Sequence, residues 1–362
     1  MMKIAFKELL FYKKKYLLIE LLVVLMMFMV VFLSGLTNGL ARAVSASIEN
    51  MDATYFIVAD DADQVITYSS LSEEKQDSID ELGLETATAL NIQRGSFAEK
   101  GEKDKIDVTY FAVDTDSFIA PEIISGKTAS KTDTIVLNDS YKEDGFEIGD
   151  KIVDKASEKT LTVVGFTKNS MYGHTAAAYV SKETFVEMNQ ELNPQYQWLP
   201  QAIVTQDEDL SSKELNNLEI VDKQSLISKI PGYSAEQSTL NMILWVLVLA
   251  AAAILGVFFY IVTLEKRQQF GVMKALGTKM SEIAYQEISQ TFLLSLFGVV
   301  LGDGLAILLS RVLPSSMPFF LNYGDVLTVS AAFILICLLA GLISVLKVSR
   351  IDPIEIINGG ED

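Results

Sequence analysis

The side chains most often used in catalysis and metal binding are scarce in this chain. It has one histidine, His174, and one cysteine, Cys337, which lies inside a long apolar run. The sequence shows no metal-ligand spacing, nucleophile elbow or catalytic triad, and no glycine-rich loop that could hold nucleotide phosphates. A single cysteine also excludes a disulfide framework. The sequence therefore argues against an enzyme, and any use of ATP would require a separate nucleotide-binding subunit.

Two acidic residues border or interrupt the apolar segments and are candidates for intramembrane proton chemistry. Glu20 lies near the start of the first segment, where its carboxylate can reach the membrane interface. Asp303 lies in the third segment between two glycines, where close helix packing or a water-filled vestibule could hold it. Neither makes a convincing proton relay.

Hydrophobicity and charge are segregated along the chain. Half of the residues are hydrophobic, yet the net charge is -18. Apolar runs crowd residues 16–42 and 240–347, and most of the acidic residues lie between them. The charge therefore belongs to one soluble domain between membrane segments, which argues against nucleic acid or anionic lipid as that domain's partner.

Four apolar stretches are long enough to cross a bilayer, which takes about 20 residues. They are Leu21–Ala41, Leu240–Leu264, Ile288–Ser310 and Val326–Leu346, and Asp303 is the only charged residue within them. The first stretch is too long for the apolar core of a signal peptide, and no small-residue cleavage pattern follows it. It is expected to be a retained membrane anchor.

Lysine and arginine in the short flanks predict the orientation of these spans. The basic flanking residues are Lys3, Lys7, Lys13, Lys14 and Lys15 at the start, Lys266, Arg267, Lys274 and Lys279 after the second span, and Lys347 and Arg350 at the end. Both termini are therefore expected in the cytoplasm and residues 46–236 outside. The first fifteen residues, MMKIAFKELLFYKKK, are compatible with an interfacial amphipathic helix, or more simply with a positive-inside anchor.

In the segment between the first two spans, the apolar runs are shorter and apolar residues alternate with polar ones. The predicted strands are 55–59, 105–113, 134–138, 151–154, 161–166, 176–181 and 202–205. Helices are predicted at 72–81, 181–192 and 211–217, each opening on a serine that can serve as N-cap. The fold expected is an α-helical membrane protein of four transmembrane helices, with a mixed α+β extracytoplasmic domain inserted between helices 1 and 2.

The resulting layout divides the chain into nine parts. They are a cytoplasmic amphipathic helix (1–15), transmembrane helix 1 (16–45), the extracellular α+β domain (46–235), transmembrane helix 2 (236–265), a cytoplasmic coupling helix (266–286), transmembrane helix 3 (287–313), an extracellular loop (314–325), transmembrane helix 4 (326–347) and a cytoplasmic C-terminus (348–362).

This layout, together with two motifs, resembles the MacB/FtsX-type permeases of ABC transporters. In that family the segment after span two reads R-x-x-E/Q-I/F-G-(V/I)-(M/L)-(K/R)-A-(L/I)-G and docks on the ATPase as a coupling helix. EKRQQFGVMKALGTKMSEI, at 265–283, matches it through Gln269, Phe270, Gly271, Lys274, Ala275 and Gly277, and Arg267 lies one residue closer to Gln269 than the arginine of the pattern. The ending DPIEIING, at 352–359, resembles the family's D-P-(I/A)-E-A-(I/L) through Asp352, Pro353 and Glu355.

A closer resemblance is to HrtB-type permeases, the membrane half of a haem-efflux pump in Gram-positive bacteria. The peptides that resemble this subgroup are KELLFYKKKYLLI at the start, FLSGLTNGL at 32–40, NSMYGH at 169–174, GYSAEQSTLNM at 232–242 and PSSMPFFL at 314–321. They lie in both membrane and outer regions, and several belong to no general permease motif.

Haem, as the substrate that this resemblance implies, narrows the search for a site. It is a flat apolar dianion whose iron proteins bind through His, Cys, Met or Tyr. The candidates near the outer membrane surface are Tyr172, His174, Tyr233, Glu236, Met242 and Phe56, with iron held by Tyr172 or Tyr233. The alternative for the tyrosines is an interfacial anchor or a strand cap, and the alternative for His174 is an incidental loop residue.

The resemblance implies a 2+2 assembly in the plasma membrane of a Gram-positive bacterium: two copies of this chain and two cytosolic ATPase subunits, which bind the ATP. No intrinsic cofactor is expected, and haem enters laterally from the lipid bilayer. Two alternatives share the coupling machinery. One is a permease for a peptide antibiotic or lipid, and the other is a non-transporting signal transmitter that controls an outer partner.

Overall fold

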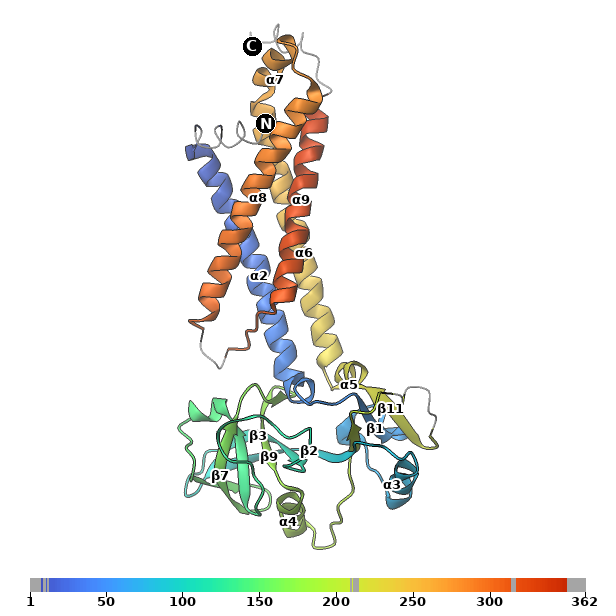
Figure 1. Cartoon of the computed structure of the whole chain (residues 1–362). Helices are drawn as coiled ribbons and strands as arrows, with labels where there is room; N and C mark the ends of the chain where they lie inside the picture. Colours follow the sequence, from blue (N-terminus) through green and yellow to red (C-terminus); the bar gives the residue numbers. More distant parts are fainter. Residues whose placement is uncertain are drawn as a thin grey trace. The chain divides into compact units, whose positions relative to one another are not determined.

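The computed structural model describes residues 8, 11, 13–208, 210, 215–313 and 317–349. It divides into two compact units, a helical unit of residues 1–39 and 239–362 and an inserted domain of residues 40–238 (Figure 1). Most of the predicted helix at 1–15, the C-terminal motif at 352–355 and most of the predicted helix at 211–217 lie outside the described residues.

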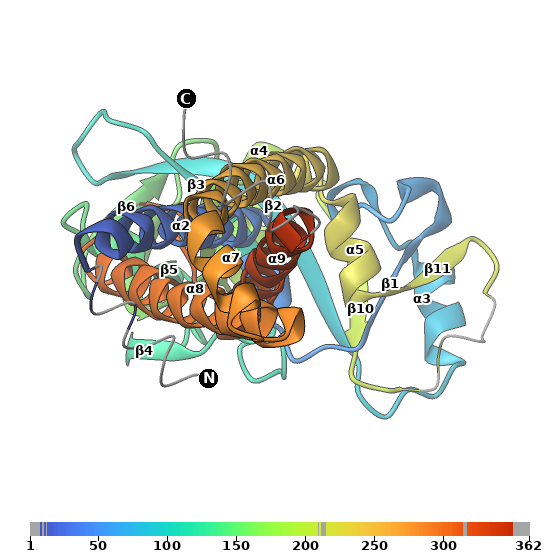
Figure 2. The ribbon, with the colours of Figure 1, turned by 90° about the horizontal axis from the view of Figure 1, so that it is seen from above.

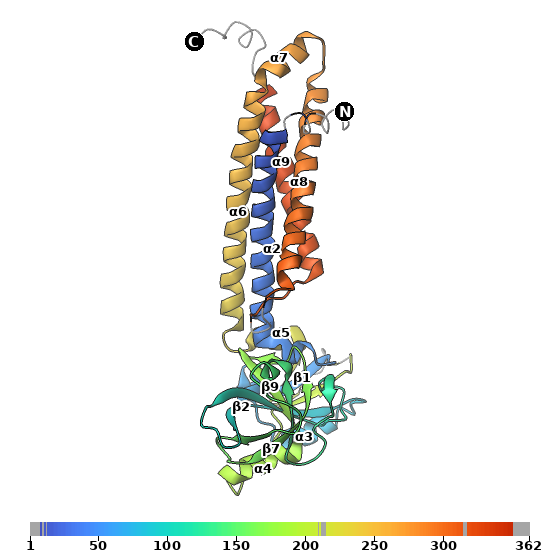
Figure 3. The same ribbon diagram turned by 90° about the vertical axis from the view of Figure 1, so that its left-hand side faces the viewer.

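Four long helices, each apolar enough to cross a membrane, run alongside one another in the helical unit (Figures 1 and 3). They are α2 (Lys13–Glu49), α6 (Tyr233–Glu265), α8 (Met280–Ser310) and α9 (Tyr323–Ser349). All four extend beyond the predicted apolar cores because polar turns continue the helix at their ends. The expected coupling helix over 266–286 is shorter, α7 (Arg267–Ala275), since a turn at Leu276–Lys279 separates it from α8.

Glycines on α8 bring it close to α2. A β-carbon added at Gly298 would lie 2.3 Å from Val23, and one at Gly302 would lie 2.9 Å from Met27. Small residues at helix contacts let backbones approach closely, which strengthens packing where the surrounding lipid is as apolar as the side chains. The core of the bundle is otherwise built from aliphatic and aromatic side chains of all four helices.

Hydrogen bonds between polar side chains link helices of the bundle. Asp303 on α8 accepts a hydrogen bond from Ser330 on α9 at 2.9 Å, and Asn38 on α2 donates to Asp325 at the start of α9 at 2.8 Å. Both bonds link neighbouring helices of the bundle.

The segment after α8 lies across α2. The backbone N–H of Phe320 donates to the carbonyl of Gly35 at 2.9 Å. A β-carbon at Gly39 would lie 2.1 Å from the carbonyl oxygen of Pro318, so only glycine fits there. We call residues 317–321 the strap. It joins two peptides, FLSGLTNGL and PSSMPFFL, that are far apart in the sequence.

The inserted domain is built on one eleven-stranded mixed sheet. Its strands are β1 (Tyr55–Ala59), β2 (Thr88–Glu99), β3 (Ile106–Val113), β4 (Ile123–Gly126), β5 (Thr134–Asn138), β6 (Lys151–Asp154), β7 (Thr160–Thr167), β8 (Met171–Tyr172), β9 (Thr175–Val180), β10 (Ala202–Thr205) and β11 (Leu218–Asp222). The main path runs β11-β1-β10-β2-β3-β9-β5-β7-β4, with β6 beside β2 and β7 and with β8 beside β9.

The long strand β2 connects two lobes of this sheet (Figure 2). Its first residues pair with β10, and its later ones pair with β3 and then β6. One core is centred on Phe111 and Tyr179, and a second on Phe97 and Phe166. Alternate residues of β2 and β3 point to opposite faces, so the two strands contribute to both cores.

The described residues of the inserted domain also form three α-helices and three 3-10 turns. They are α3 (Glu73–Asp80), α4 (Lys182–Leu192), α5 (Lys223–Lys229), η1 (Asp60–Ala62), η2 (Ile66–Tyr68) and η3 (Asp139–Lys142). Ser72 and Ser181 accept hydrogen bonds from the third residue beyond them, so the predicted N-caps of α3 and α4 are confirmed. All seven predicted strands are also present.

Candidate functional site

The tip of the β8–β9 hairpin carries two of the predicted substrate-contacting residues. Gly173 and His174 form its two-residue loop with φ values of +56° and +64°, the left-handed geometry of a tight hairpin turn. Their backbone N–H groups donate to the carbonyls of Val44 and Ala43, both at 2.9 Å. The hairpin is therefore fixed to the last turns of α2.

Arg94, on β2, also contacts this hairpin. Its Nη2 donates to the carbonyl oxygen of Gly173 at 2.5 Å. A β-carbon at Gly173 would lie 2.2 Å from that nitrogen, so the close approach of the guanidinium requires glycine. The turn is thus specified twice, by its φ angle and by this contact.

His174 connects the hairpin to the first turn of α6. Its Nε2 lies 3.0 Å from Oε2 of Glu236, and 52% of the histidine side chain and 26% of the glutamate side chain are exposed. A carboxylate is favoured in the first turn of a helix by the helix dipole. Both side chains are partly exposed, so the pair is accessible to a ligand.

Tyr172 and Phe56 belong instead to the core of the inserted domain. Tyr172 is 4% exposed and packs edge to face on Phe111, with ring centroids 5.7 Å apart. Burial raises the pKa of the Tyr172 phenol to about 12, because the phenolate would be poorly solvated. Phe56, on β1, is fully buried in the same cluster. Neither ring presents a face to a ligand.

Tyr233 begins α6 and is half-buried against that core. Tyr172, His174, Tyr233 and Glu236 therefore come from two elements, the β8–β9 hairpin and the start of α6, that pack together within the inserted domain. Met242 lies further along α6 in the helical unit, where it is 61% exposed.

Sequence reasoning did not find a hollow beside the end of α2. Its volume is about 220 Å³. Hydroxyl groups of Ser47, Ser170 and Tyr179 line it, and Asn50 closes one side by donating to the carbonyl of Asn169 at 2.8 Å. Two serines and a tyrosine from distant parts of the chain carry no sequence signal, so only the fold could bring them together.

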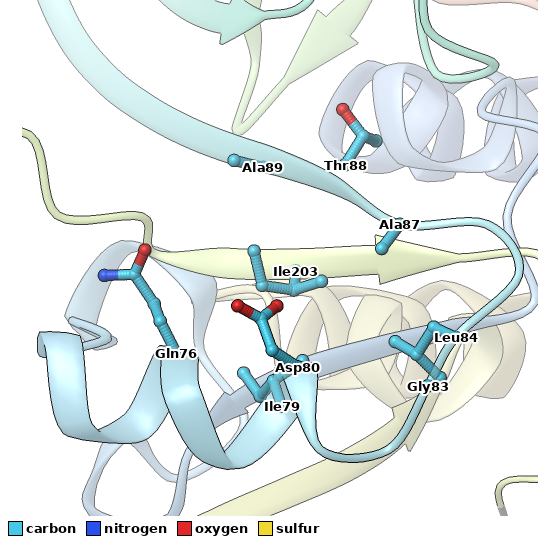
Figure 4. Close-up of a pocket in the computed structure, with 9 residues that line it drawn as sticks. All are labelled: Gln76, Ile79, Asp80, Gly83, Leu84, Ala87, Thr88, Ala89 and Ile203. Atoms are coloured by element: carbon cyan, nitrogen blue, oxygen red, sulfur yellow. The ribbon is translucent and has the colours of Figure 1, made fainter.

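A second hollow, of about 290 Å³, lies between α3 and the strands β2 and β10 (Figure 4). The Asp80 carboxylate points toward Ile203 there, and Gln76 extends from the same helix (Figure 4). None of the predicted substrate-contacting residues lines it. Among the described residues, moreover, no group of three or more His, Cys, Asp or Glu side chains could hold a metal ion.

The described residues among those predicted to couple to an ATPase lie on and just after α7. Phe270 and Gly271 are buried, and Phe270 packs with Ile283 of α8. Gln269 is exposed. Gly277 follows the helix with φ +90°, the conformation that ends helices at glycine. One face of α7 is therefore held against α8 while another is presented outward.

Comparison with known proteins agrees with this architecture. The family described as MacB-like periplasmic core domain matches residues 17–216, and that described as FtsX-like permease C-terminal matches residues 241–353. The hemin transport system permease protein HrtB of Staphylococcus haemolyticus is 30% identical over 99% of this chain and 100% of the relative. That of Staphylococcus epidermidis is 29% identical over the same shares.

Among solved structures, the periplasmic region of MacB from Actinobacillus actinomycetemcomitans aligns with 51% of this chain and 96% of its own, at 10% identity and a TM-score of 0.34.

Four membrane-crossing helices, a sheet domain inserted after the first and family matches over both parts define a permease of the ABC transporter class. Within that class, the chain belongs to the MacB/FtsX-like permease family and is similar to its HrtB-type members over its full length.

Proposed function

We propose that this chain is the permease subunit of an ATP-driven efflux pump that removes haem from the plasma membrane of a Gram-positive bacterium. The observation that carries the proposal is the full-length similarity to two permeases named for hemin transport. Two copies of the chain would assemble with two ATPase subunits, which bind the ATP. Both termini and α7 would face the cytoplasm, and the inserted domain would face outward.

The site we propose for haem lies where the β8–β9 hairpin meets the start of α6. Haem brings an apolar ring, two carboxylates and an iron with open coordination positions. Tyr233 is the better iron ligand of the two tyrosines, because it is half-buried whereas Tyr172 is enclosed and holds its proton. His174 and Glu236 would then adjust the charge beside the ring.

Transport in this scheme needs two states that differ in affinity for haem. ATP-driven closure of the ATPase dimer would displace α7 and tilt the spans. That motion would weaken haem binding and release haem outward. The chain itself would supply the haem site, the transport path and the helix α7 that transmits the motion, while the ATPase would supply the energy.

The proposal is tested by titrating haemin into the full-length, detergent-solubilised chain and following the Soret band. We expect saturable binding that Tyr233→Phe weakens strongly and Tyr172→Phe weakens little. Tyr196→Phe is the matched control, because Tyr196 packs against the other core of the inserted domain. An absence of saturable binding, with and without the ATPase subunit, would reject haem as substrate and favour a peptide or lipid substrate or a signalling role.

A further inference from the structure

A buried cluster of charged and polar side chains surrounds Lys266, at the junction of α6 and α7. The side chain of Lys266 is 7% exposed, and its Nζ lies 2.8 Å from Glu8 and 2.7 Å from Glu287. It also donates to Oε1 of Gln290 at 2.5 Å and lies 5.7 Å from the centroid of the Tyr16 ring. We call these five residues the Lys266 cluster.

The cluster draws together parts of the chain that are distant in sequence. Glu8 precedes α2 and Tyr16 is in its first turns, whereas Glu287 and Gln290 lie one turn apart on α8. Tyr16 donates to Gln290 at 3.3 Å, and Gln286 donates to Glu8 at 2.9 Å. The acceptors of one lysine thus join the N-terminal segment to α8.

Within the cluster, Lys266 and the carboxylates favour each other's charged forms although burial opposes charge. Burial alone would lower the pKa of Lys266, but Glu287, Tyr16 and Glu8 together outweigh this effect, and the pKa lies above its usual range. The pKa of Glu8 is lowered although burial opposes the shift, because Lys266 donates to it. A buried ion pair stabilises little in total, but removal of one partner is costly since it leaves an uncompensated charge.

Lys266 is also the single residue that separates α6 from α7. α6 ends at Glu265 and α7 begins at Arg267, and Lys266 itself departs from helical geometry, with φ -84° and ψ 0°. A break of this kind can bend, so motion applied to α7 would be absorbed there unless the break were held. The side chains of the Lys266 cluster hold it.

We propose that Lys266 is the positioning residue that couples α7 to α2 and α8, so that displacement of α7 moves the membrane helices instead of bending the α6–α7 junction. This inference rests on the ATPase-coupling part of the proposed function, and it is independent of the substrate. It assigns to Lys266 a role distinct from that of the exposed α7 residues, which would contact the ATPase.

The first test needs neither substrate nor ATPase. Spin labels are placed on cysteines at Val272 of α7 and Leu18 of α2, which are 57% and 63% exposed, in a Cys337→Ala background. The full-length chain is studied in lipid nanodiscs by pulsed electron resonance. We expect one narrow distance distribution that Lys266→Gln broadens and Lys266→Arg preserves.

Lys279→Gln is the matched control, because it removes the same charge from an exposed lysine of the same segment. A distribution as narrow in Lys266→Gln as in this control would overturn the proposal. If Lys266→Gln does not fold, Lys266→Gln combined with Glu287→Gln removes one buried charge of each sign. A narrow distribution in this double variant would overturn the proposal equally.

The second test measures coupling in the assembled pump. With the ATPase subunit reconstituted, haemin exported per ATP hydrolysed should fall at least about fivefold in Lys266→Gln, the lower end of measured couplings between sites, while assembly and hydrolysis persist. A proportional loss of assembly, hydrolysis and export would show a structural role only and reject the inference. Failure of haemin export in the wild type would reject the proposed substrate, while the spin-label result would still stand.

Discussion

At the scale of single residues, the two candidate tyrosines differ in what surrounds their hydroxyl groups. Tyr172 is enclosed by the core and Tyr233 is half-buried at the start of a helix. Ferric iron binds tyrosine as the phenolate, and burial without a compensating charge disfavours that form. The location of each ring therefore decides its suitability as a ligand, although both tyrosines lie in equally suggestive peptides.

The raised pKa of Tyr172 predicts how stability changes at high pH. An unfolded tyrosine titrates near pH 10, whereas Tyr172 does so at about 12. Between these values the unfolded chain binds fewer protons than the folded one, so stability is full below pH 10 and falls as pH rises toward 12. The loss is up to about 1.4 kcal/mol per pH unit for each such group.

Tyr172→Phe removes this titrating group and should therefore reduce the alkaline loss of stability. Chemical denaturation of the full-length chain at pH 9 and pH 11 measures the difference. Equal losses in the variant and the wild type would show that Tyr172 ionises as freely in the folded chain as in the unfolded one.

At the scale of elements, the strap depends on glycines of α2. Gly39→Ala places a methyl group against the carbonyl of Pro318, where a β-carbon would lie 2.1 Å away. Either the strap or the helix must shift, and such overpacking costs about 1–3 kcal/mol. We expect a lower thermal unfolding temperature in detergent, measured by static light scattering or intrinsic fluorescence.

Gly304→Ala is the control for this prediction, since no atom lies within 4 Å of a β-carbon added there. It should be neutral or slightly stabilising, because alanine is the better helix former. A Gly39→Ala variant as stable as Gly304→Ala would show that the strap does not contact α2 as described.

Helices and strands could be predicted from the sequence where their apolar residues form a clear pattern. They could not be predicted where contacts with neighbouring elements determine the structure. The strand at 134–138 has three consecutive aliphatic residues, 135–137, at its centre, and its bounds are those predicted. By contrast, β2 mixes Asn91, Gln93 and Arg94 with apolar residues because it passes between two lobes, and the sequence alone did not reveal it. The two-residue β8 exists only through its pairing with β9.

The parts of the candidate site also differ in how far the sequence predicts them. Residue types identified Tyr233, His174 and Glu236, and the fold brought the hairpin and the start of α6 together. The burial of Tyr172 and Phe56 could not be predicted, because an aromatic residue in a strand looks alike on either face of a sheet. The Lys266 cluster could not be predicted either, because its members, from Glu8 to Gln290, are far apart in the sequence.

At the scale of the whole molecule, the proposed orientation gives different regions different access to a water-soluble reagent. The basic residues flank the same ends of the four helices, which favours those ends in the cytoplasm. Leu192 at the end of α4 is 52% exposed, and Leu276 after α7 is 81% exposed. Both positions are thus reachable by a reagent but are expected on opposite sides of the membrane.

Cysteine labelling in whole cells tests this arrangement. In a Cys337→Ala background, a membrane-impermeant maleimide should label Leu192→Cys in intact cells and should label Leu276→Cys only after the cells are permeabilised. Permeabilised cells provide the control, because both cysteines must then react. Labelling of Leu276→Cys in intact cells, with Leu192→Cys protected, would invert the topology and place α7 where no cytosolic ATPase could reach it.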